Sequence, residues 1–352
     1  MSRVFVAMSG GVDSSLAAAL LADRGEQVVG VWMRLVPTGA DSDAPRCCGT
    51  SEAGEQARRA AAHLGIPFYA LDYSELFGRE VVDRFVQAYA GAQTPNPCVA
   101  CNQYVKFDAL LRDVIGKFGA DRLATGHYAR VIERDGRRRL LRARDASKDQ
   151  SYALYALGQF ELARLELPIG DLRDKAEVRA RAAAYHLPNA ESAESMDICF
   201  IGGDYREFVR ERAPDAFVPG AVRRADGALV GRHGGLGTLT VGQRSGVGVA
   251  AGERLYVLSL DSGRNEAVVG TRDEVRVRSY GLRDLRWTGP APDGEVRTTA
   301  ALRYRGTLVP CVVRPGASEV VLDEPALVAP GQVAVFYDGD EVIGGGVIDR
   351  AA

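Results

Sequence analysis

Short, continuous apolar runs alternate with amphipathic stretches along the first part of the chain. Such runs, bounded by turn residues, are typical of strands buried on both faces of a parallel sheet. The runs that predict strands are residues 4–8, 27–33, 67–71 and 122–124. Helical spacing of apolar residues predicts helices over residues 16–21, 51–64, 73–89, 106–118 and 174–186. Because strands and helices alternate, we expect an α/β domain whose parallel sheet is covered on both faces.

The pattern changes to short strands further along the chain. Residues 131–142 predict a hairpin closed by Asp135-Gly136, a pair that suits a tight left-handed turn. From about residue 205 the chain is punctuated by glycine, and after Arg272 apolar residues recur at every second position. Many short strands separated by turn signals indicate a small β-barrel.

A glycine-serine turn directly follows the first predicted strand and reads Ser9-Gly10-Gly11-Val12-Asp13-Ser14-Ser15. Its two glycines let the backbone come close to a ligand, and the free N–H groups at the start of the next helix favour an anion. Asp13 offers a carboxylate for Mg²⁺ or for a helix cap. The turn is neither a Walker loop nor Gly-x-Gly-x-x-Gly. A simple capping turn is the alternative, but the whole pattern after a buried strand favours a phosphate-binding turn.

The composition is that of an ordinary soluble globular protein, with 352 residues, 46% hydrophobic and 26% charged, and room for two or three domains. No apolar run could span a membrane and no signal peptide is evident, so we expect a cytoplasmic protein.

The formal net charge of −2 excludes a uniformly basic nucleic-acid binder but allows a local basic face. Arg137-Arg138-Arg139 is expected to be solvated, with an RNA contact as the alternative. Lysine is scarce, so Lys106 and Lys148 stand out within polar motifs. The remaining histidines are expected at a helix end or at the surface: His63, His186 and His233.

Six cysteines in a reducing compartment are not expected to form structural disulfides. Cys311 lies in a strand-like apolar run and is expected to be inert, whereas Cys47-Cys48 in a loop is either a redox or metal accessory or without function. Cys98-x-x-Cys101 has three interpretations. Zinc would require a second matching pair, which the sequence lacks, and a redox dithiol would require the motif to follow a strand and open a helix. The third interpretation pairs this segment with Cys199, for which a buried, inert strand residue is the alternative.

Several polar blocks of the chain, taken together, resemble one family. The Ser9–Ser14 turn is similar to the loop of the PP-loop ATP pyrophosphatases, which split ATP into AMP and pyrophosphate while adenylating a substrate. In Thr94-Pro95-Asn96-Pro97 the prolines favour an extended turn over a helix. With the blocks that follow, spanning residues 9 to 305, the chain resembles the bacterial tRNA-specific 2-thiouridylases. Those blocks are Cys101-Asn102, Lys106-Phe107, Ala124-Thr125-Gly126-His127-Tyr128, Lys148-Asp149-Gln150-Ser151-Tyr152, Asp197-Ile198-Cys199-Phe200-Ile201-Gly202 and Arg303-Tyr304-Arg305.

This resemblance implies an architecture and a reaction. The architecture is a PP-loop catalytic domain over residues 1–203, a small central β-rich domain over 204–270 and a tRNA-binding C-terminal β-barrel over 271–352. The implied reaction converts the wobble uridine of the tRNAs for Lys, Glu and Gln to 2-thiouridine, uses ATP and Mg²⁺, and releases AMP and pyrophosphate. The implied partners are tRNA and a persulfide donor, either a cysteine desulfurase or a sulfur relay protein, and the protein is expected to be monomeric.

The resemblance also assigns individual residues. Cys199 would carry the persulfide, Cys101 would be the partner cysteine and nucleophile, and Asp13 would belong to the catalytic group and hold Mg²⁺. The residues implied to bind ATP are Ala7, Met8, Ser9, Gly10, Gly11, Val12, Asp13, Ser14, Met33 and Gly126. Those implied to meet tRNA are Thr94, Pro95, Asn96, Pro97, which would hold the target base, and Lys148, Asp149, Gln150, Arg303 and Tyr304.

One position departs from the family pattern, which often has Asp where this chain has Cys98. Cys98, Cys101 and Cys199 are then three thiols that could converge. Three thiolates with an open fourth site are what a 4Fe–4S cluster needs if its unique iron is to carry a sulfide. We expect a persulfide on Cys199 as the sulfur carrier, with the cluster as the second hypothesis. A PP-loop small-molecule synthetase or amidotransferase is the alternative of a different class, and it would leave the barrel and Cys199 without a role.

Overall fold

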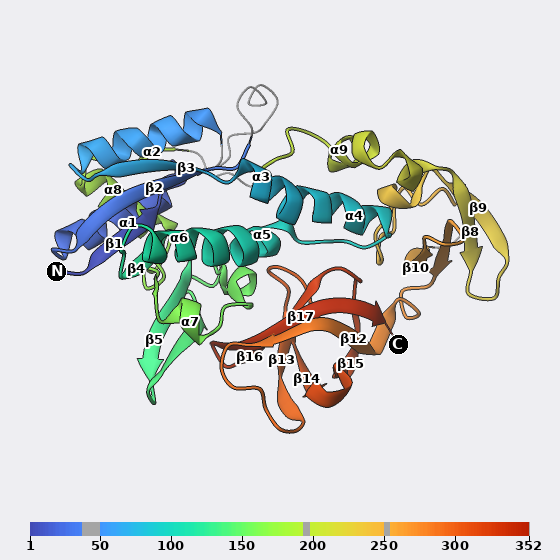
Figure 1. Cartoon of the computed structure of the whole chain (residues 1–352). Coiled ribbons are helices and arrows are strands. Elements are labelled where there is room, and N and C mark those ends of the chain that lie inside the picture. Colours follow the sequence, from blue (N-terminus) through green and yellow to red (C-terminus); the bar gives the residue numbers. More distant parts are fainter. Residues whose placement is uncertain (37–49, 193–197, 250–253, 352) are drawn as a thin grey trace.

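The computed structural model describes residues 1–36, 50–192, 198–249 and 254–351. Figure 1 shows an α/β part in blue and green, a smaller part that contains β8, β9 and β10, and an orange-to-red barrel. Cys47, Cys48 and residues 194–197, for which predictions were made, lie outside the described residues. No helix within the described residues is long and apolar enough to cross a bilayer.

A five-stranded parallel sheet forms the centre of the α/β part, as predicted. Its order is β3-β2-β1-β4-β7, and each of the four pairings is parallel. Along β1, Val4 and Val6 pack into one apolar cluster and Phe5 into another, because successive side chains point to opposite faces. The two-residue β7 was not predicted, since so short a strand has no recognisable pattern. The bounds are β1 (Arg3–Ala7), β2 (Gln27–Arg34), β3 (Phe68–Asp72), β4 (Arg122–Thr125) and β7 (Leu165–Glu166).

Helices cover both faces of this sheet (Figure 1). The face of Val4 and Val6 is covered by α1 (Val12–Asp23), α2 (Ser51–His63) and α8 (Lys175–Ala184). The face of Phe5 is covered by two longer helices, each with a π-helical stretch. One is formed by α3 (Ser74–Phe77), η1 (Gly78–Asp83) and α4 (Arg84–Ala90). The other is formed by α5 (Pro97–Ala100), η2 (Cys101–Leu110) and α6 (Leu111–Gly116).

The second long helix begins at Pro97, well before its predicted start near Lys106. Proline is tolerated at the first helical position, where the missing N–H would have had no helical partner. Asn96 caps the helix, because its Oδ1 accepts hydrogen bonds from the backbone N–H of Cys98 (3.1 Å) and Val99 (3.4 Å). The prediction of an extended turn is therefore wrong beyond Asn96, and the Cys98-x-x-Cys101 motif opens a helix.

The last part of the chain forms the predicted barrel. Its strands follow in the order β12-β15-β14-β13-β16-β17, and β12 also pairs with β17. The hairpin β5–β6 turns at Asp135 (φ 54°) and Gly136 (φ 70°), as predicted, and β6 pairs with β17. The α/β part and the barrel therefore share one eight-stranded sheet. The bounds are β5 (Ala129–Arg134), β6 (Arg137–Arg142), β12 (Arg276–Trp287), β13 (Val296–Ala301), β14 (Leu308–Arg314), β15 (Glu319–Leu327), β16 (Val333–Asp338) and β17 (Glu341–Ala351).

The part between them is a four-stranded sheet in the order β10-β11-β8-β9. The prediction that His233 lies at the surface is wrong, because the ring is buried among its neighbours. Its Nδ1 accepts from the N–H of Gly235 (3.0 Å), and its Nε2 lies 3.2 Å from the Asn265 carbonyl oxygen. His63 ends α2 and His186 is exposed, as predicted. The strands are β8 (Gly220–Arg224), β9 (Leu229–His233), β10 (Tyr256–Asp261) and β11 (Glu266–Gly270), and the remaining helices and helical turns are η3 (Ser151–Leu154), α7 (Gln159–Leu162), α9 (Tyr205–Arg212), η4 (Pro214–Phe217), η5 (Leu236–Thr238) and η6 (Pro315–Ala317).

Candidate active site

The glycine-serine turn lies at the carboxyl edge of the parallel sheet, between β1 and α1. Ser14 holds the turn together: its Oγ accepts from the N–H of Ser9 (3.0 Å) and donates to the Gly11 carbonyl (3.1 Å). Gly11 is the N-cap of α1 and supplies no side-chain acceptor. The first N–H groups of α1 are therefore not capped by a side chain, which is the arrangement that suits a bound phosphate.

Two glycines allow the close approaches around this turn. Gly10 has φ +83°, and a Cβ there would lie 2.4 Å from the carbonyl oxygen of Ala53. At Gly126, just beyond β4, a Cβ would lie 2.6 Å from the backbone nitrogen of Ser14. The turn is thus enclosed by backbone on two sides, and a side chain at either glycine would fill it. This fits a site that receives nucleotide phosphates, with Gly126 in the place implied for ATP binding.

Asp13 is held by two donors from distant segments. Tyr128 donates its hydroxyl to Oδ1 (2.7 Å), and the Lys175 Nζ lies 2.6 and 2.8 Å from the two carboxylate oxygens. Lys175, the first residue of α8, is only 14% exposed. The sequence argument missed Lys175, although the scarcity of lysine was a signal that could have found it. The pair places one cation beside the turn and ties it to the carboxylate of Asp13 within the turn.

Asn189 is a second residue that the sequence argument missed. Its buried side-chain amide donates to the Gly10 carbonyl (2.7 Å) and to the Ser15 hydroxyl (2.9 Å). Asn189, in a segment that follows α8, therefore stabilises the turn through these two hydrogen bonds. The other residues implied for ATP binding lie nearby in the chain or at the same sheet edge. Ala7 ends β1, and Met33 is buried near the end of β2. Met8, just before the turn, and Val12, within it, are also buried.

Cys101 and Cys199 border the same apolar cluster. Cys101 is buried within it at the start of η2, and half-buried Cys199 packs against it together with Phe200. Phe200 anchors that segment by ring contacts with Phe77 (5.7 Å) and Phe85 (5.4 Å). Cys199 lies in a turn, so the interpretation of residues 198–201 as a core strand is wrong.

Cys98 is exposed on α5, one helical turn before Cys101. Among the described residues, no three His, Cys, Asp or Glu side chains are placed to hold a metal ion together. Cys311 is fully buried in β14, where desolvation raises the pKa of its thiol to about 12, as expected for an inert cysteine. The structure thus gives the three motif cysteines different surroundings.

The barrel holds the Thr94–Pro97 segment in place. The Thr94 N–H donates to the Pro330 carbonyl (2.9 Å), and the Gln332 side chain donates to the Thr94 carbonyl (2.9 Å). The neighbouring Gln93 accepts from Arg283 of β12 (2.9 Å). The barrel therefore contacts the start of the loop implied to hold the target base, and the Cys98-x-x-Cys101 helix starts directly after that loop.

The remaining residues implied to meet tRNA fall into two groups. Asp149 is buried and its oxygens accept from the N–H of Ala143 (2.9 Å) and the hydroxyl of Ser151 (2.9 Å), so it shapes the segment. The Gln150 side chain accepts from the N–H of Tyr128 (2.9 Å), and the Tyr128 hydroxyl donates to Asp13 of the glycine-serine turn. Arg303 and Tyr304 are exposed on the barrel, and the Tyr304 ring lies 5.9 Å from that of Tyr152. The structure thus brings the Lys148–Tyr152 block close to the Arg303–Arg305 block.

Comparisons with known proteins cover the same three parts. Family models match residues 2–203 (tRNA methyl transferase HUP domain), 206–271 (tRNA methyl transferase PRC-barrel domain) and 277–348 (aminomethyltransferase beta-barrel domain). The chain is 46% identical to the tRNA-specific 2-thiouridylase MnmA of Chloroflexus aggregans, 47% identical to that of Chloroflexus aurantiacus and 45% identical to that of Moorella thermoacetica, in each case over 99% of both chains. The match to a solved 4-thiouridine synthetase–RNA complex with bound ATP covers 61% of this chain and 51% of that chain at 16% identity, with a TM-score of 0.36. The identity over the full length shows that the chain belongs to the tRNA-specific 2-thiouridylase family.

Proposed function

We propose that this protein uses ATP to convert the wobble uridine of tRNA, in the tRNAs for Lys, Glu and Gln, to 2-thiouridine. Full-length similarity to proteins named tRNA-specific 2-thiouridylase supports the substrate. The observation that carries the chemistry is that Cys101 lies within, and Cys199 packs against, one apolar cluster that also includes β1 and β2 residues. A phosphate-binding turn follows β1 directly.

The first step activates the base. A carbonyl oxygen is a poor leaving group, so the uracil O2 attacks the α-phosphorus of ATP, pyrophosphate leaves, and C2 then bears AMP as a leaving group. The N–H groups at the start of α1 and the Lys175 ammonium stabilise the negative charge that develops on the phosphates. Bound Mg²⁺ would add charge neutralisation, and Asp13 would supply its protein carboxylate, with phosphate oxygens as further ligands.

The second step transfers sulfur. The terminal sulfur of a Cys199 persulfide attacks C2, and AMP departs with the electrons of the C–O bond. The Cys101 thiolate then attacks the Cys199 sulfur, the S–S bond to the base breaks, and 2-thiouridine is released. The two cysteines are left as a disulfide, so the two electrons gained by the transferred sulfur come from their thiols. A thiol reductant then reduces the disulfide. A persulfide donor, which is a cysteine desulfurase or a sulfur relay protein, restores the Cys199 persulfide for the next turnover. The enzyme acts as a monomer in this scheme.

Mass spectrometry of the wobble nucleoside, after incubation with ATP and a persulfide donor, tests this proposal. Cys199→Ser abolishes thiolation because it removes the carrier. Cys101→Ser allows attack on C2 but not release, so a covalent tRNA–Cys199 adduct that thiols can cleave accumulates. Cys98→Ser, a matched exposed control on the same helix, retains activity. Full activity of Cys199→Ser would refute the assignment.

The cluster hypothesis predicts a different result for Cys98. If Cys98, Cys101 and Cys199 held a 4Fe–4S cluster, Cys98→Ser would abolish activity, and anaerobically purified protein would be brown and lose activity on iron chelation. Among the described residues no three His, Cys, Asp or Glu side chains are grouped to hold a metal, which supports the persulfide scheme over the cluster. Pyrophosphate release that requires tRNA separates both schemes from a small-molecule synthetase, which needs no RNA.

A further inference from the structure

A cavity of about 210 Å³ lies between the β5–β6 hairpin and the barrel. The proposed reaction assigns it no role. Its lining comes from both parts of the chain and includes Arg137, Arg138, Arg139, Trp287, Pro290 and Glu341. We call it the hairpin–barrel cavity. Its position at the β6–β17 pairing means that strands of the shared sheet form its walls.

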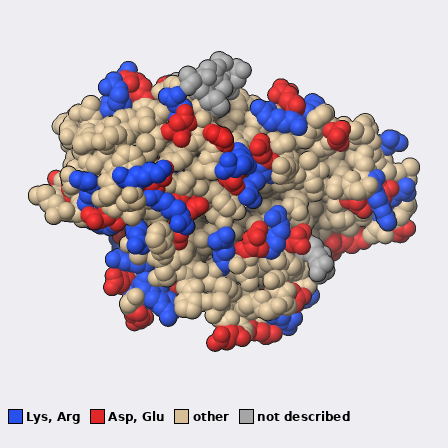
Figure 2. All heavy atoms as spheres, viewed as in Figure 1, with Lys and Arg blue, Asp and Glu red and all other residues tan. Residues whose placement is uncertain are grey.

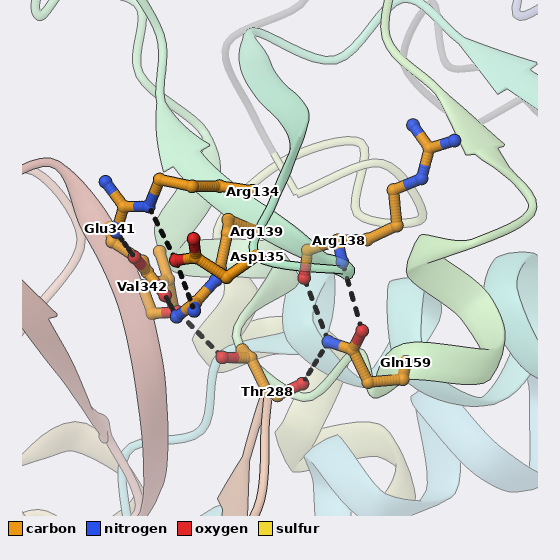
Figure 3. Close-up of polar contacts among 8 residues, drawn as sticks. All are labelled: Arg134, Asp135, Arg138, Arg139, Gln159, Thr288, Glu341 and Val342. Carbon is orange, nitrogen blue, oxygen red and sulfur yellow. Dashed lines mark hydrogen bonds and ion pairs between the residues drawn. The ribbon is translucent and has the colours of Figure 1, made fainter.

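Polar contacts hold the two walls of the cavity together (Figure 3). The Gln159 amide donates to the Arg138 carbonyl (2.9 Å) and the Thr288 carbonyl (2.8 Å), while its oxygen accepts from the Arg138 N–H (3.1 Å). Thr288 in turn donates its hydroxyl to the Val342 carbonyl (2.8 Å). The cavity is therefore preformed, which lowers the entropy that a ligand must lose on binding.

The lining contains three guanidinium groups and one carboxylate, that of Glu341. Two of the three guanidinium groups are neutralised, because Arg138 forms an ion pair with Glu133 (3.1 Å) and Arg139 with Glu341 (2.8 Å). Glu341 already accepts from Arg139 (2.8 Å) and from Arg134 (3.0 Å). Within the described part of the chain, the Arg137 side chain forms no ion pair, and the buried Arg139 Nε has no hydrogen-bond partner. Acidic and basic groups are interspersed over the face seen in Figure 2, so what distinguishes Arg137 is that it forms no ion pair among the described residues.

The other wall presents a fixed aromatic ring. Trp287 is half-buried, its ring packs 6.0 Å from that of Phe336, and a Cβ on Gly344 would lie 2.9 Å from it. Pro290 and Pro292 extend this apolar wall. A rigid indole face beside guanidinium groups suits an unpaired base with its phosphate, because bases stack on aromatic rings while arginine neutralises the backbone.

We propose that the hairpin–barrel cavity binds an unpaired nucleotide of the tRNA substrate outside the anticodon arm, with the base against Trp287 and its phosphate against Arg137. This inference depends on the proposed function in one respect, which is that the substrate is tRNA. The target base is assigned to the Thr94–Pro97 segment, which a separate set of barrel residues holds. The cavity would therefore add affinity for whole tRNA.

Filter binding of tRNA over a range of salt concentrations tests this. Arg137→Ala should raise the Kd roughly fivefold and reduce the slope of log K against log salt by about 1. Arg264→Ala/Arg314→Ala, which removes two exposed charges outside the cavity, should change neither. Trp287→Ala should raise the Kd about fivefold or more, whereas Trp287→Phe should restore it. Melting temperatures verify that each variant folds, and the tryptophan pair serves if the arginine variant does not fold.

An isolated anticodon stem-loop should bind wild type and cavity variants equally, which places the nucleotide outside that arm. Free UMP should compete with tRNA only weakly; strong competition would assign the cavity to a free nucleotide. Equal tRNA affinity in all variants would overturn the proposal. So would variants that bind tRNA normally but lose thiolation only with a protein sulfur donor, since the cavity would then bind a protein. Absence of thiolation by the wild type, with cavity-dependent tRNA binding intact, would instead refute the proposed function alone.

Discussion

Replacing Gly126 with alanine should displace the glycine-serine turn, for which we propose phosphate binding, while leaving its polar groups unchanged. A Cβ at Gly126 would lie 2.6 Å from the Ser14 nitrogen, 2.7 Å from the Asp13 carbonyl carbon and 2.9 Å from the Ser14 Cα. All three atoms belong to the backbone, so no flexible side chain can move aside. The start of α1, or the end of β4, must shift.

The loss of stability and of ATP affinity depends on the contacts that hold the start of α1 in place. Restoring an ordinary contact requires a shift of roughly 0.8 Å. Such a shift opposes the Asp13 contacts to Tyr128 and Lys175 and the Asn189 contacts to the turn. Overpacking of this kind destabilises a protein by about 1–3 kcal/mol. Displacement of a positioning group by about 1 Å can lower the rate up to a hundredfold.

Calorimetric titration with a non-hydrolysable ATP analogue, together with thermal unfolding, measures both effects. We expect Gly126→Ala to weaken ATP binding at least tenfold, by roughly 1.4 kcal/mol, and to lower the melting temperature by several degrees. Gly78→Ala is the matched control, because its helical position has no atom within 4 Å of the added Cβ and alanine favours a helix by about 0.5–1 kcal/mol. Wild-type ATP affinity and thiolation in Gly126→Ala would refute the assignment of this backbone contact to nucleotide binding.

Three further outcomes are expected. Gln332→Ala removes the hydrogen bond to the Thr94 carbonyl and should weaken tRNA binding about two- to tenfold without changing the ATP affinity, as filter binding and calorimetry would detect. Burial lowers the pKa of His233 below its ordinary 6.5, so the stability that the neutral ring contributes is present above that pH and is lost as the pH falls. The melting temperature should therefore fall more steeply from about pH 7 to about pH 5 in wild type than in His233→Gln, and parallel curves would contradict this. Because burial raises the pKa of Cys311 to about 12, iodoacetamide should alkylate exposed Cys98 in the native protein but Cys311 only after unfolding, as peptide mass spectrometry would show.

The parts of the site that the sequence predicts well are local. The Ser9–Ser14 turn is recognisable because its strand, its glycines and its helix are contiguous, and its hydrogen bonds close within the same segment. The hairpin turn at Asp135-Gly136 is local for the same reason, since its two left-handed residues determine the turn. Period-two patterning likewise predicts the barrel strands, because alternate residues face the barrel core.

The residues that were missed depend on contacts between distant segments. Lys175 and Asn189 reach the turn from segments near and beyond α8, and no pattern within either segment indicates where its side chain points. The start of the Cys101 helix was misplaced for a different reason. Proline disfavours a helix interior but suits the first helical position, and only the Asn96 cap distinguishes the two.

In addition to any role in tRNA binding, the barrel helps to position the segment of the α/β part that precedes Cys101. It contacts the α/β part through the β17–β6 pairing and through Pro330 and Gln332, which hold both backbone polar groups of Thr94. The helix that carries Cys101 is capped only two residues after Thr94, at Asn96. Because this short connection leaves little freedom between anchor and cap, the barrel determines where that helix begins. The position of Cys101 relative to the phosphate-binding turn therefore depends on both ends of the chain.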